Sequence, residues 1–257
     1  MPDNPLNRNC PICSSEISHV IDNVTSNEKT VDVVKCSKCG FIYMLDIFFE
    51  NTHTHGLSQI YVDNPLPRRR HYAILDCLSK RGGITNVAEI GAGHGQLASL
   101  LLENGYSYLG YEPNIERANF CSSKGIKIIN NLFSVSPNTF DCVILDNVLE
   151  HVPSPIQLMN EIYESLKKDG IVLIVVPNAN DLRKFSSKWK NKHLYIRAHI
   201  NYFTSSSLRK LAFKTGFSFE VFKVRFQPIC SILFNLIKIC WKLQFFPTGL
   251  YVTFQKK

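Results

Sequence analysis

The sequence has few charged residues and no long uninterrupted apolar run. Charged side chains make up 19% and apolar side chains 45% of its 257 residues, a balance that excludes a disordered or collagen-like chain. Its longest apolar stretch, 228–246, contains Lys238 and Lys242, so it falls short of the roughly 20 apolar residues that span a bilayer. The first residues lack the basic and apolar regions of a signal peptide. We therefore expect a cytoplasmic protein without a transmembrane segment.

Acidic side chains are almost absent from the last third of the chain. Up to Asp181 there are 14 Lys and Arg against 20 Asp and Glu, whereas the remainder has 15 basic residues and one acidic residue, Glu220. The net charge of +8 therefore divides into −6 before this point and +14 after it. This division excludes a uniformly basic protein. It predicts that an anionic partner meets the last third of the chain.

Four of the nine cysteines form two CxxC pairs, Cys10 with Cys13 and Cys36 with Cys39, and the pairs are separated by 22 residues. Two such turns offer four thiolates to a tetrahedral Zn(II), and a segment of roughly 45 residues is too short to build a stable core alone. We expect a zinc-ribbon-like module over 1–50 with structural Zn(II), followed by a linker and leading helix over 51–80. A redox pair, which would need a thioredoxin-like setting, and a chance spacing are the alternatives.

A glycine-rich turn follows a predicted strand and precedes a predicted helix. The strand 87–90 leads into Gly91-Ala92-Gly93-His94-Gly95, and a helical run covers 96–103. Such a turn lets the backbone approach a ligand, which the amides at the start of the helix can then bind. Glu89, just before the turn, would repel a pyrophosphate, so the pattern disfavours a nicotinamide dinucleotide.

Strands alternate with helices over the rest of the chain. Polar residues follow the predicted strands 108–111, 127–129 and 140–145, namely Glu112, Asn130-Asn131 and Asp146-Asn147. This order predicts a parallel sheet with ligands at the carboxyl ends of its strands. Glu112 is placed to accept both hydroxyls of a ribose.

From residue 64 onward the sequence resembles the class I S-adenosylmethionine-dependent methyltransferases. The resemblance is carried by the EIGAGHG turn, the carboxylate at Glu112, and the segments DNVLEHVP, LKKDGIVLIVVPN and HINYFTSSSLRKLAFKTGF. It implies an α/β fold over 81–257, with a Rossmann-like seven-stranded sheet and helices on both faces.

The same resemblance implies S-adenosylmethionine as the cofactor. Glu89 would lie near its ammonium group, Glu112 would bind the ribose, and Asn130 or Asn131 would lie by the adenine, where many relatives have Asp. The full set of expected cofactor-binding residues is Glu89, Gly91, Ala92, Gly93, Gly95, Gln96, Glu112, Pro113, Asn130, Asn131, Asp146 and Asn147. A cofactor with a positive sulfur and an ammonium group agrees with carboxylates at this turn.

Basic residues gather after the predicted strand 171–176. Between Asp181 and Glu220 there are nine Lys and Arg and no acidic residue. In the family this region commonly forms part of the acceptor site, and its charge would suit phosphate or diphosphate groups; a solvated loop and helix face is the alternative. His199, His151 and Tyr195 are the candidates for proton transfer, with structural roles as the alternative.

The combination of a zinc module and a methyltransferase domain resembles enzymes of deoxysugar and surface-polysaccharide pathways. We therefore expect methyl transfer to a sugar, nucleotide sugar or other small phosphorylated metabolite, with C-, O- and N-methylation all compatible. An RNA base methyltransferase is the alternative, because some of those enzymes carry a four-cysteine module. Against it, residues 1–50 contain four basic and seven acidic side chains. A non-catalytic binding protein is the third hypothesis, disfavoured by the intact Glu89 and Glu112.

The apolar segment 228–246 looks like an insertion before the last strand, 249–255. We expect it to pack on the sheet. Contact with a second subunit of a homo-oligomer or with a membrane surface is the alternative.

Overall fold

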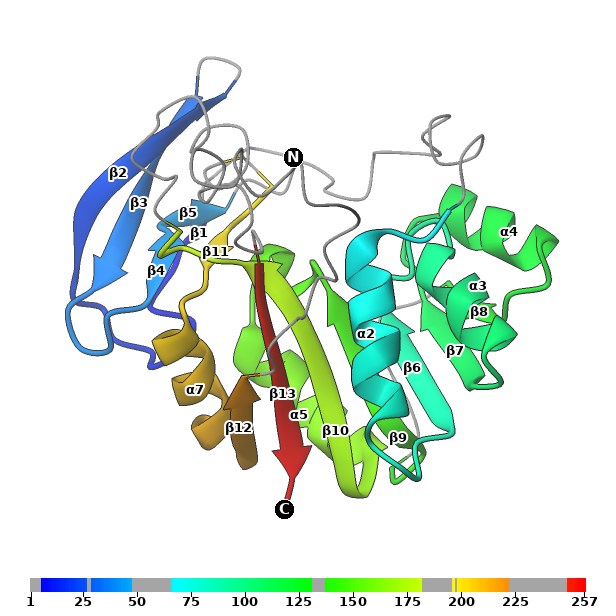
Figure 1. The fold of residues 1–257 in the computed structure, drawn as a ribbon. Helices are drawn as coiled ribbons and strands as arrows, with labels where there is room; N and C mark the ends of the chain where they lie inside the picture. Colours follow the sequence, from blue (N-terminus) through cyan, green and yellow to red (C-terminus); the bar gives the residue numbers. More distant parts are fainter. Residues whose placement is uncertain are drawn as a thin grey trace, which may run out of the picture.

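The computed structural model describes residues 6–26, 29–47, 66–130, 137–181, 196, 198–221 and 249–257. Its largest element is a seven-stranded sheet with the strand order β12-β13-β10-β9-β6-β7-β8 (Figure 1). These strands are β6 (Asn86–Ile90), β7 (Ser107–Tyr111), β8 (Ile128–Ile129), β9 (Phe140–Asp146), β10 (Leu166–Pro177), β12 (Phe217–Val221) and β13 (Gly249–Lys256). The predicted seven-stranded Rossmann-like sheet is confirmed.

The strands from β10 to β8 run parallel, and β13 pairs antiparallel with both β10 and β12. The parallel strands therefore end at one edge of the sheet, as the sequence predicted. This edge brings together the glycine turn after β6, Glu112 after β7 and Asp146 at the end of β9.

Both faces of the sheet are buried, because alternate side chains of each strand point to opposite faces. In β9, Val143 and Leu145 belong to one apolar core, whereas Cys142 and Ile144 belong to another. The helices α2 (Arg69–Ser79), α3 (Gln96–Glu103) and α4 (Ile115–Ser123) contribute to the second core, and α5 (Pro155–Ser165) and α7 (Ser205–Lys214) to the first. Helices therefore cover both faces, as predicted.

The amino-terminal residues form a small antiparallel sheet with the order β11-β4-β3-β2 (Figure 1). Its strands are β2 (Ser18–Ser26), β3 (Lys29–Cys36), β4 (Ile42–Met44) and β11 (Asn201–Tyr202), and a separate pair joins β1 (Leu6–Asn7) to β5 (Asp46–Ile47). The strand β11 comes from the segment after β10, and it pairs with β4 through Asn201 and Tyr43. The larger domain thus supplies one strand of the small sheet.

The small sheet packs directly on the large domain. Cys10, Cys36 and Phe41 belong to the same apolar core as Leu208 and Leu211 of α7. The ring of Phe41 lies 5.2 Å from that of Phe203. One continuous core therefore joins the four-cysteine segment to the sheet face covered by α5 and α7.

Two predictions lie outside the described residues: the packing of the apolar insertion 228–246 and most of the basic segment after Asp181. Within the described ranges, no helix combines the length and apolar character needed to cross a membrane.

Candidate active site

The turn after β6 takes a conformation that depends on glycine. Gly91 and Gly95 have φ values of 77° and 74°, in the left-handed region that side chains rarely adopt. A Cβ atom on Gly91 would lie 2.8 Å from Val148 Cγ2, and one on Gly95 would lie 2.6 Å from Ile126 Cδ1. The glycines therefore allow the turn to lie tightly between the segment after β9 and the residues before β8.

Glu89 lies at the end of β6 with only 3% of its surface exposed. The Tyr108 hydroxyl donates a hydrogen bond to Glu89 Oε2 at 2.6 Å. Burial raises the pKa of this carboxyl to about 8, although the bond from Tyr108 opposes the rise. A cation placed next to Glu89 would favour its ionised form.

Glu112, at the end of β7, is also 3% exposed. Its Oε2 atom accepts a hydrogen bond from the Gly93 amide at 2.8 Å, and its Oε1 atom accepts one from the Asn114 amide at 2.9 Å. A carboxylate has about four acceptor positions, so these bonds leave capacity for a further donor. The carboxylate is thereby held against the glycine turn.

Asp146, at the end of β9, is held by two residues of α2. Its carboxylate accepts hydrogen bonds from Arg70 Nε at 2.6 and 2.9 Å, and His71 Nε2 lies 3.3 Å from Oδ2. The Asn147 side-chain amide donates to Oδ1 at 2.8 Å. Burial alone would raise the pKa of Asp146, but His71 and Arg70 hold it below its ordinary value.

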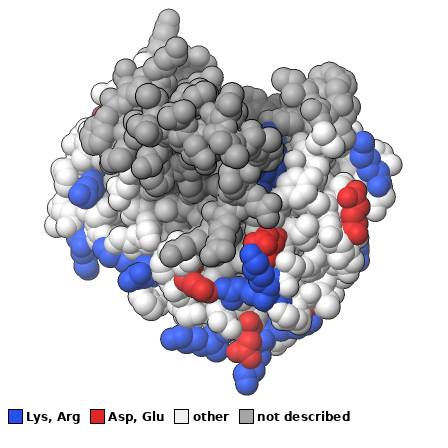
Figure 2. Space-filling model, viewed as in Figure 1, with Lys and Arg blue, Asp and Glu red and all other residues white. Residues whose placement is uncertain are grey.

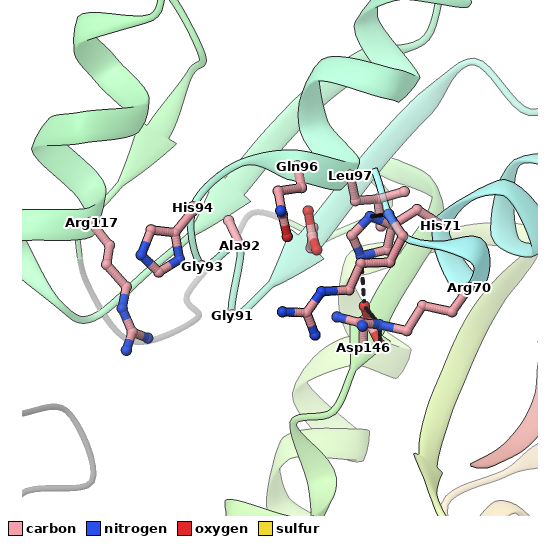
Figure 3. Close-up of a pocket in the computed structure, with 12 residues that line it drawn as sticks. Arg70, His71, Gly91, Ala92, Gly93, His94, Gln96, Leu97, Arg117 and Asp146 are labelled. Atoms are coloured by element: carbon pink, nitrogen blue, oxygen red, sulfur yellow. Dashed lines mark hydrogen bonds and ion pairs between the residues drawn. The ribbon is translucent and has the colours of Figure 1, made fainter. Parts of the chain in front are cut away.

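These residues surround one pocket at the carboxyl edge of the sheet. Figure 3 shows Arg70, His71 and Asp146 at one end, Arg117 and His94 at the other, and the Gly91–Gly93 turn between them. Six predicted cofactor-binding residues line it: Glu89, Gly91, Ala92, Gly93, Gln96 and Asp146. Its other lining residues are Arg68, Arg70, His71, His94, Leu97 and Arg117.

The remaining predicted cofactor residues lie around this pocket or outside the description. Glu112 accepts a hydrogen bond from the amide of Gly93, which lines the pocket. Gly95 is the residue directly before α3. Asn147 bonds to Asp146, and the Asn130 side-chain amide donates to the carbonyls of Glu112 and Pro113 at 2.8 and 3.0 Å. Asn131 lies outside the described residues.

Arg70 and His71 are not among the site residues predicted from the sequence. The sequence feature that could have indicated these two residues is the basic run Arg68-Arg69-Arg70-His71 at the start of the leading helix. This helix precedes the first strand of the motif, so only its packing beside α3 shows that the run faces Asp146.

Two of the predicted proton-transfer residues lie together. The rings of His151 and His199 have centroids 5.0 Å apart at 61°. His151 ends the short 3-10 helix η1 (Leu149–His151), and the Ala198 carbonyl lies 2.6 Å from its Nδ1 atom. Tyr195, the third candidate, lies outside the described residues.

The two CxxC pairs converge on one point. Ligand atoms of Cys10, Cys13, Cys36 and Cys39 all lie within 4.8 Å of one another, and the Sγ atoms of Cys10 and Cys39 are 3.5 Å apart. In each pair the residue after the second cysteine has a positive φ, 58° at Ser14 and 75° at Gly40. The two turns are thus built alike. The Cys10–Cys39 and Cys13–Cys36 sulfur separations, both 3.5 Å, are close to the roughly 3.8 Å expected for a tetrahedron with bonds of about 2.3 Å.

The described part of the surface in Figure 2 carries both signs of charge. Lys and Arg side chains are dispersed over this face, with Asp and Glu beside several of them. Ion pairs among the described residues include Lys167 with Asp141 at 2.7 Å and Arg81 with Glu220.

Comparison with known proteins decides the family. A family model described as a methyltransferase domain matches residues 60–220, more than half of the chain. The chain belongs to this methyltransferase family. This match, together with the glycine turn and the carboxylates around it, identifies the protein as an S-adenosylmethionine-dependent methyltransferase. None of the curated proteins matches this sequence.

Several solved structures share the fold of this methyltransferase. An S-adenosylmethionine-dependent methyltransferase from Archaeoglobus fulgidus has a TM-score of 0.55 at 19% identity, covering 74% of this chain and 95% of its own. A protein from Thermotoga maritima, described as a possible histamine N-methyltransferase, has a TM-score of 0.55 at 18% identity, with coverages of 77% and 94%. The plantazolicin methyltransferase BpumL, solved with SAH, has a TM-score of 0.53 at 17% identity, with coverages of 74% and 82%.

Proposed function

We propose that this methyltransferase modifies a sugar, nucleotide sugar or other small phosphorylated metabolite. The observation that carries the proposal is the charge distribution: 15 Lys and Arg and one acidic residue follow Asp181. The carboxylates of the cofactor pocket all precede this point. The basic part of the chain is therefore available to bind an anionic acceptor, because phosphate groups are bound most strongly by Arg and Lys.

Within the pocket, we assign the methionine end of the cofactor to the side formed by Arg70 and Asp146, and the ribose to Glu112. Arg70 offers further N–H donors for a carboxylate besides the Nε that binds Asp146. Glu89 and Asp146 supply negative charge near the ammonium group. We assign the adenine to the other end of the pocket, which Arg117 and His94 line (Figure 3).

When bound, the cofactor supplies a methyl group on a positively charged sulfur, which keeps the bonding electrons as the methyl leaves. The protein's part is to align the acceptor and to complement charge. An acceptor that must lose a proton needs a base, and we assign this role to His199 or His151, which lie beside each other after β10 and β9. Ionisation of the acceptor and methyl transfer then leave one extra proton on the histidine.

We also propose that the four cysteines hold structural Zn(II). The support is the donor set of four sulfur atoms, their mutual distances and the matched turns that present them. With all four positions of a tetrahedron filled by protein, no position remains for catalysis.

The acceptor class is tested by incubating the protein with S-adenosylmethionine and measuring S-adenosylhomocysteine formation. Parallel reactions contain a panel of nucleotide sugars, a panel of phosphorylated sugars, total RNA, or no acceptor as the control. We expect turnover above the control with a sugar substrate only. Turnover with RNA alone would replace this proposal by that of an RNA base methyltransferase.

A further inference from the structure

We propose that Glu150, His151 and His199 form a second metal site, which binds a divalent transition-metal ion independently of the four cysteines. One ligand atom from each of these residues lies within 4.8 Å of the others. Two residues belong to η1 and the third to the segment before β11. The site is close to the cofactor pocket, since the side chain of Val148, just before η1, lies 2.8 Å from the position that a Cβ atom on Gly91 would take.

Glu150 is the first reason for this assignment. Its exposed fraction is 1%, and among the described residues no other residue donates a hydrogen bond to either of its carboxyl oxygens. A buried polar group without a partner is costly, and a buried carboxylate costs more still. A bound cation would compensate the ionised carboxylate.

The orientation of His151 is the second reason. Its Nδ1 atom lies 2.6 Å from the Ala198 carbonyl, and because a carbonyl oxygen only accepts hydrogen bonds, Nδ1 carries the hydrogen. In the neutral ring the lone pair is then on Nε2, and Nε2 lies 4.0 Å from Glu150 Oε1. A histidine that ligates a metal almost always donates its other ring hydrogen in this way.

His199 completes the donor set from the opposite segment. It is 8% exposed, and its ring lies edge-on to that of His151. The backbone around it is fixed to η1, because the Ile200 amide donates to the Glu150 carbonyl at 2.8 Å. The two segments that supply the ligands are therefore tied together beside the ligands themselves.

Two imidazoles and one carboxylate suit Zn(II), Mn(II), Fe(II) or Co(II) better than Ca(II) or Mg(II), which prefer oxygen ligands. Three protein ligands leave a coordination position for an oxygen atom from outside the chain. His151, whose side chain is 33% exposed, provides contact with solvent. The use of such a position to bind an acceptor oxygen rests on the proposed function, whereas metal binding itself does not. A histidine whose lone pair binds the ion accepts no proton, so the base role given above to His199 or His151 applies to the metal-free protein only.

Cobalt titration of the full chain tests the site. The protein is first dialysed against a weak chelator that leaves the cysteine-bound metal in place, which metal analysis verifies. Co(II) is then added without S-adenosylmethionine. We expect one equivalent to bind with weak d–d absorption and no thiolate charge-transfer band, because the ligands are nitrogen and oxygen.

Three variants separate this site from other binding. Glu150→Gln and His199→Gln are expected to weaken Co(II) binding at least about tenfold, whereas Glu164→Gln, an exposed carboxylate of α5, should leave it unchanged. Circular dichroism establishes that each variant is folded; if Glu150→Gln is not, His151→Gln replaces it.

Absence of Co(II) binding to the wild-type protein at millimolar concentration would overturn the site. So would Co(II) binding that the folded Glu150 and histidine variants retain, or a spectrum with thiolate bands alone. The acceptor panel described above, run on the same samples, tests the proposed function separately, so the two can fail independently.

Discussion

Glu112 joins two parts of the cofactor pocket through a single carboxylate. It accepts the Gly93 amide from the glycine turn and the Asn114 amide from the start of α4. Both bonds come from backbone amides, and Arg117 Nη1 lies 4.0 Å from Glu112 Oε1. The remaining acceptor positions of its two oxygens are what a pair of ribose hydroxyls would need.

Replacement of Glu112 should therefore weaken cofactor binding. We expect Glu112→Ala to raise the dissociation constant for S-adenosylmethionine roughly 5- to 150-fold, equivalent to about 1–3 kcal/mol for lost bonds to a charged acceptor. Isothermal titration calorimetry measures the change. Glu103→Ala removes the same charge from an exposed position at the end of α3 and serves as the control. An affinity equal to that of the wild type would remove Glu112 from the ribose site.

Among individual site residues, the sequence could predict those that lie at or near the end of a strand. Glu89, Glu112 and Asp146 each end or directly follow a strand whose apolar pattern is visible in the sequence. Arg70 could not be placed, because its contact with Asp146 spans 76 positions. Glu150 was within a recognised segment, but its burial depends on the packing of a 3-10 helix that periodicity does not reveal.

Among the elements, the connection between β4, β11 and η1 depends on Arg8. Its guanidinium donates to the carbonyls of Met44 at 3.0 Å and Ile200 at 2.5 Å, and to Asn201 Oδ1 at 2.8 Å. The Asn201 side-chain amide in turn donates to the carbonyl of Leu149 in η1 at 2.9 Å and to that of Val152, the residue after η1, at 2.7 Å. One arginine next to the first CxxC pair therefore fixes the segments that carry both candidate histidines.

Loss of this guanidinium should destabilise the protein. We expect Arg8→Met to lower the free energy of unfolding by about 1–3 kcal/mol, because four backbone or amide acceptors, the Pro153 carbonyl among them, lose a charged donor. Urea denaturation followed by circular dichroism measures the difference, and Arg69→Met, an exposed arginine of α2, is the control. Equal unfolding free energies for the two variants would show that the Arg8 contacts add no net stability.

The sequence predicted most elements of the sheet but not β11. The residues 201–202 are only two positions long, and their partner strand β4 lies more than 150 positions earlier in the chain. No periodicity can be read from two residues, and the pairing arises only because α7 and the small sheet share a core. The long apolar strands β9 and β10 gave a clear local signal by contrast.

In the whole molecule, the four-cysteine segment and the methyltransferase sheet share one core. The sequence predicts a module over 1–50 that needs a metal because it is small. The structure adds that this segment also buries Phe41 and Tyr43 in the core formed with α5 and α7. Lys210 of α7 donates to the Cys39 carbonyl at 2.6 Å, so a polar contact reaches the second CxxC turn as well.

Removal of the proposed Zn(II) should therefore destabilise the whole chain and not the module alone. If the bound ion contributes about 4 kcal/mol, chelation lowers the midpoint of thermal unfolding by on the order of 10 °C for a protein of this size. Because the core is continuous, we expect one cooperative transition, with circular dichroism and cofactor binding lost together. A variant with Cys13→Ser and Cys39→Ser should begin at the lower midpoint and should not respond to the chelator. A separate early transition limited to the cysteine module would contradict a shared core, and less than half an equivalent of zinc after purification without chelator would contradict the metal.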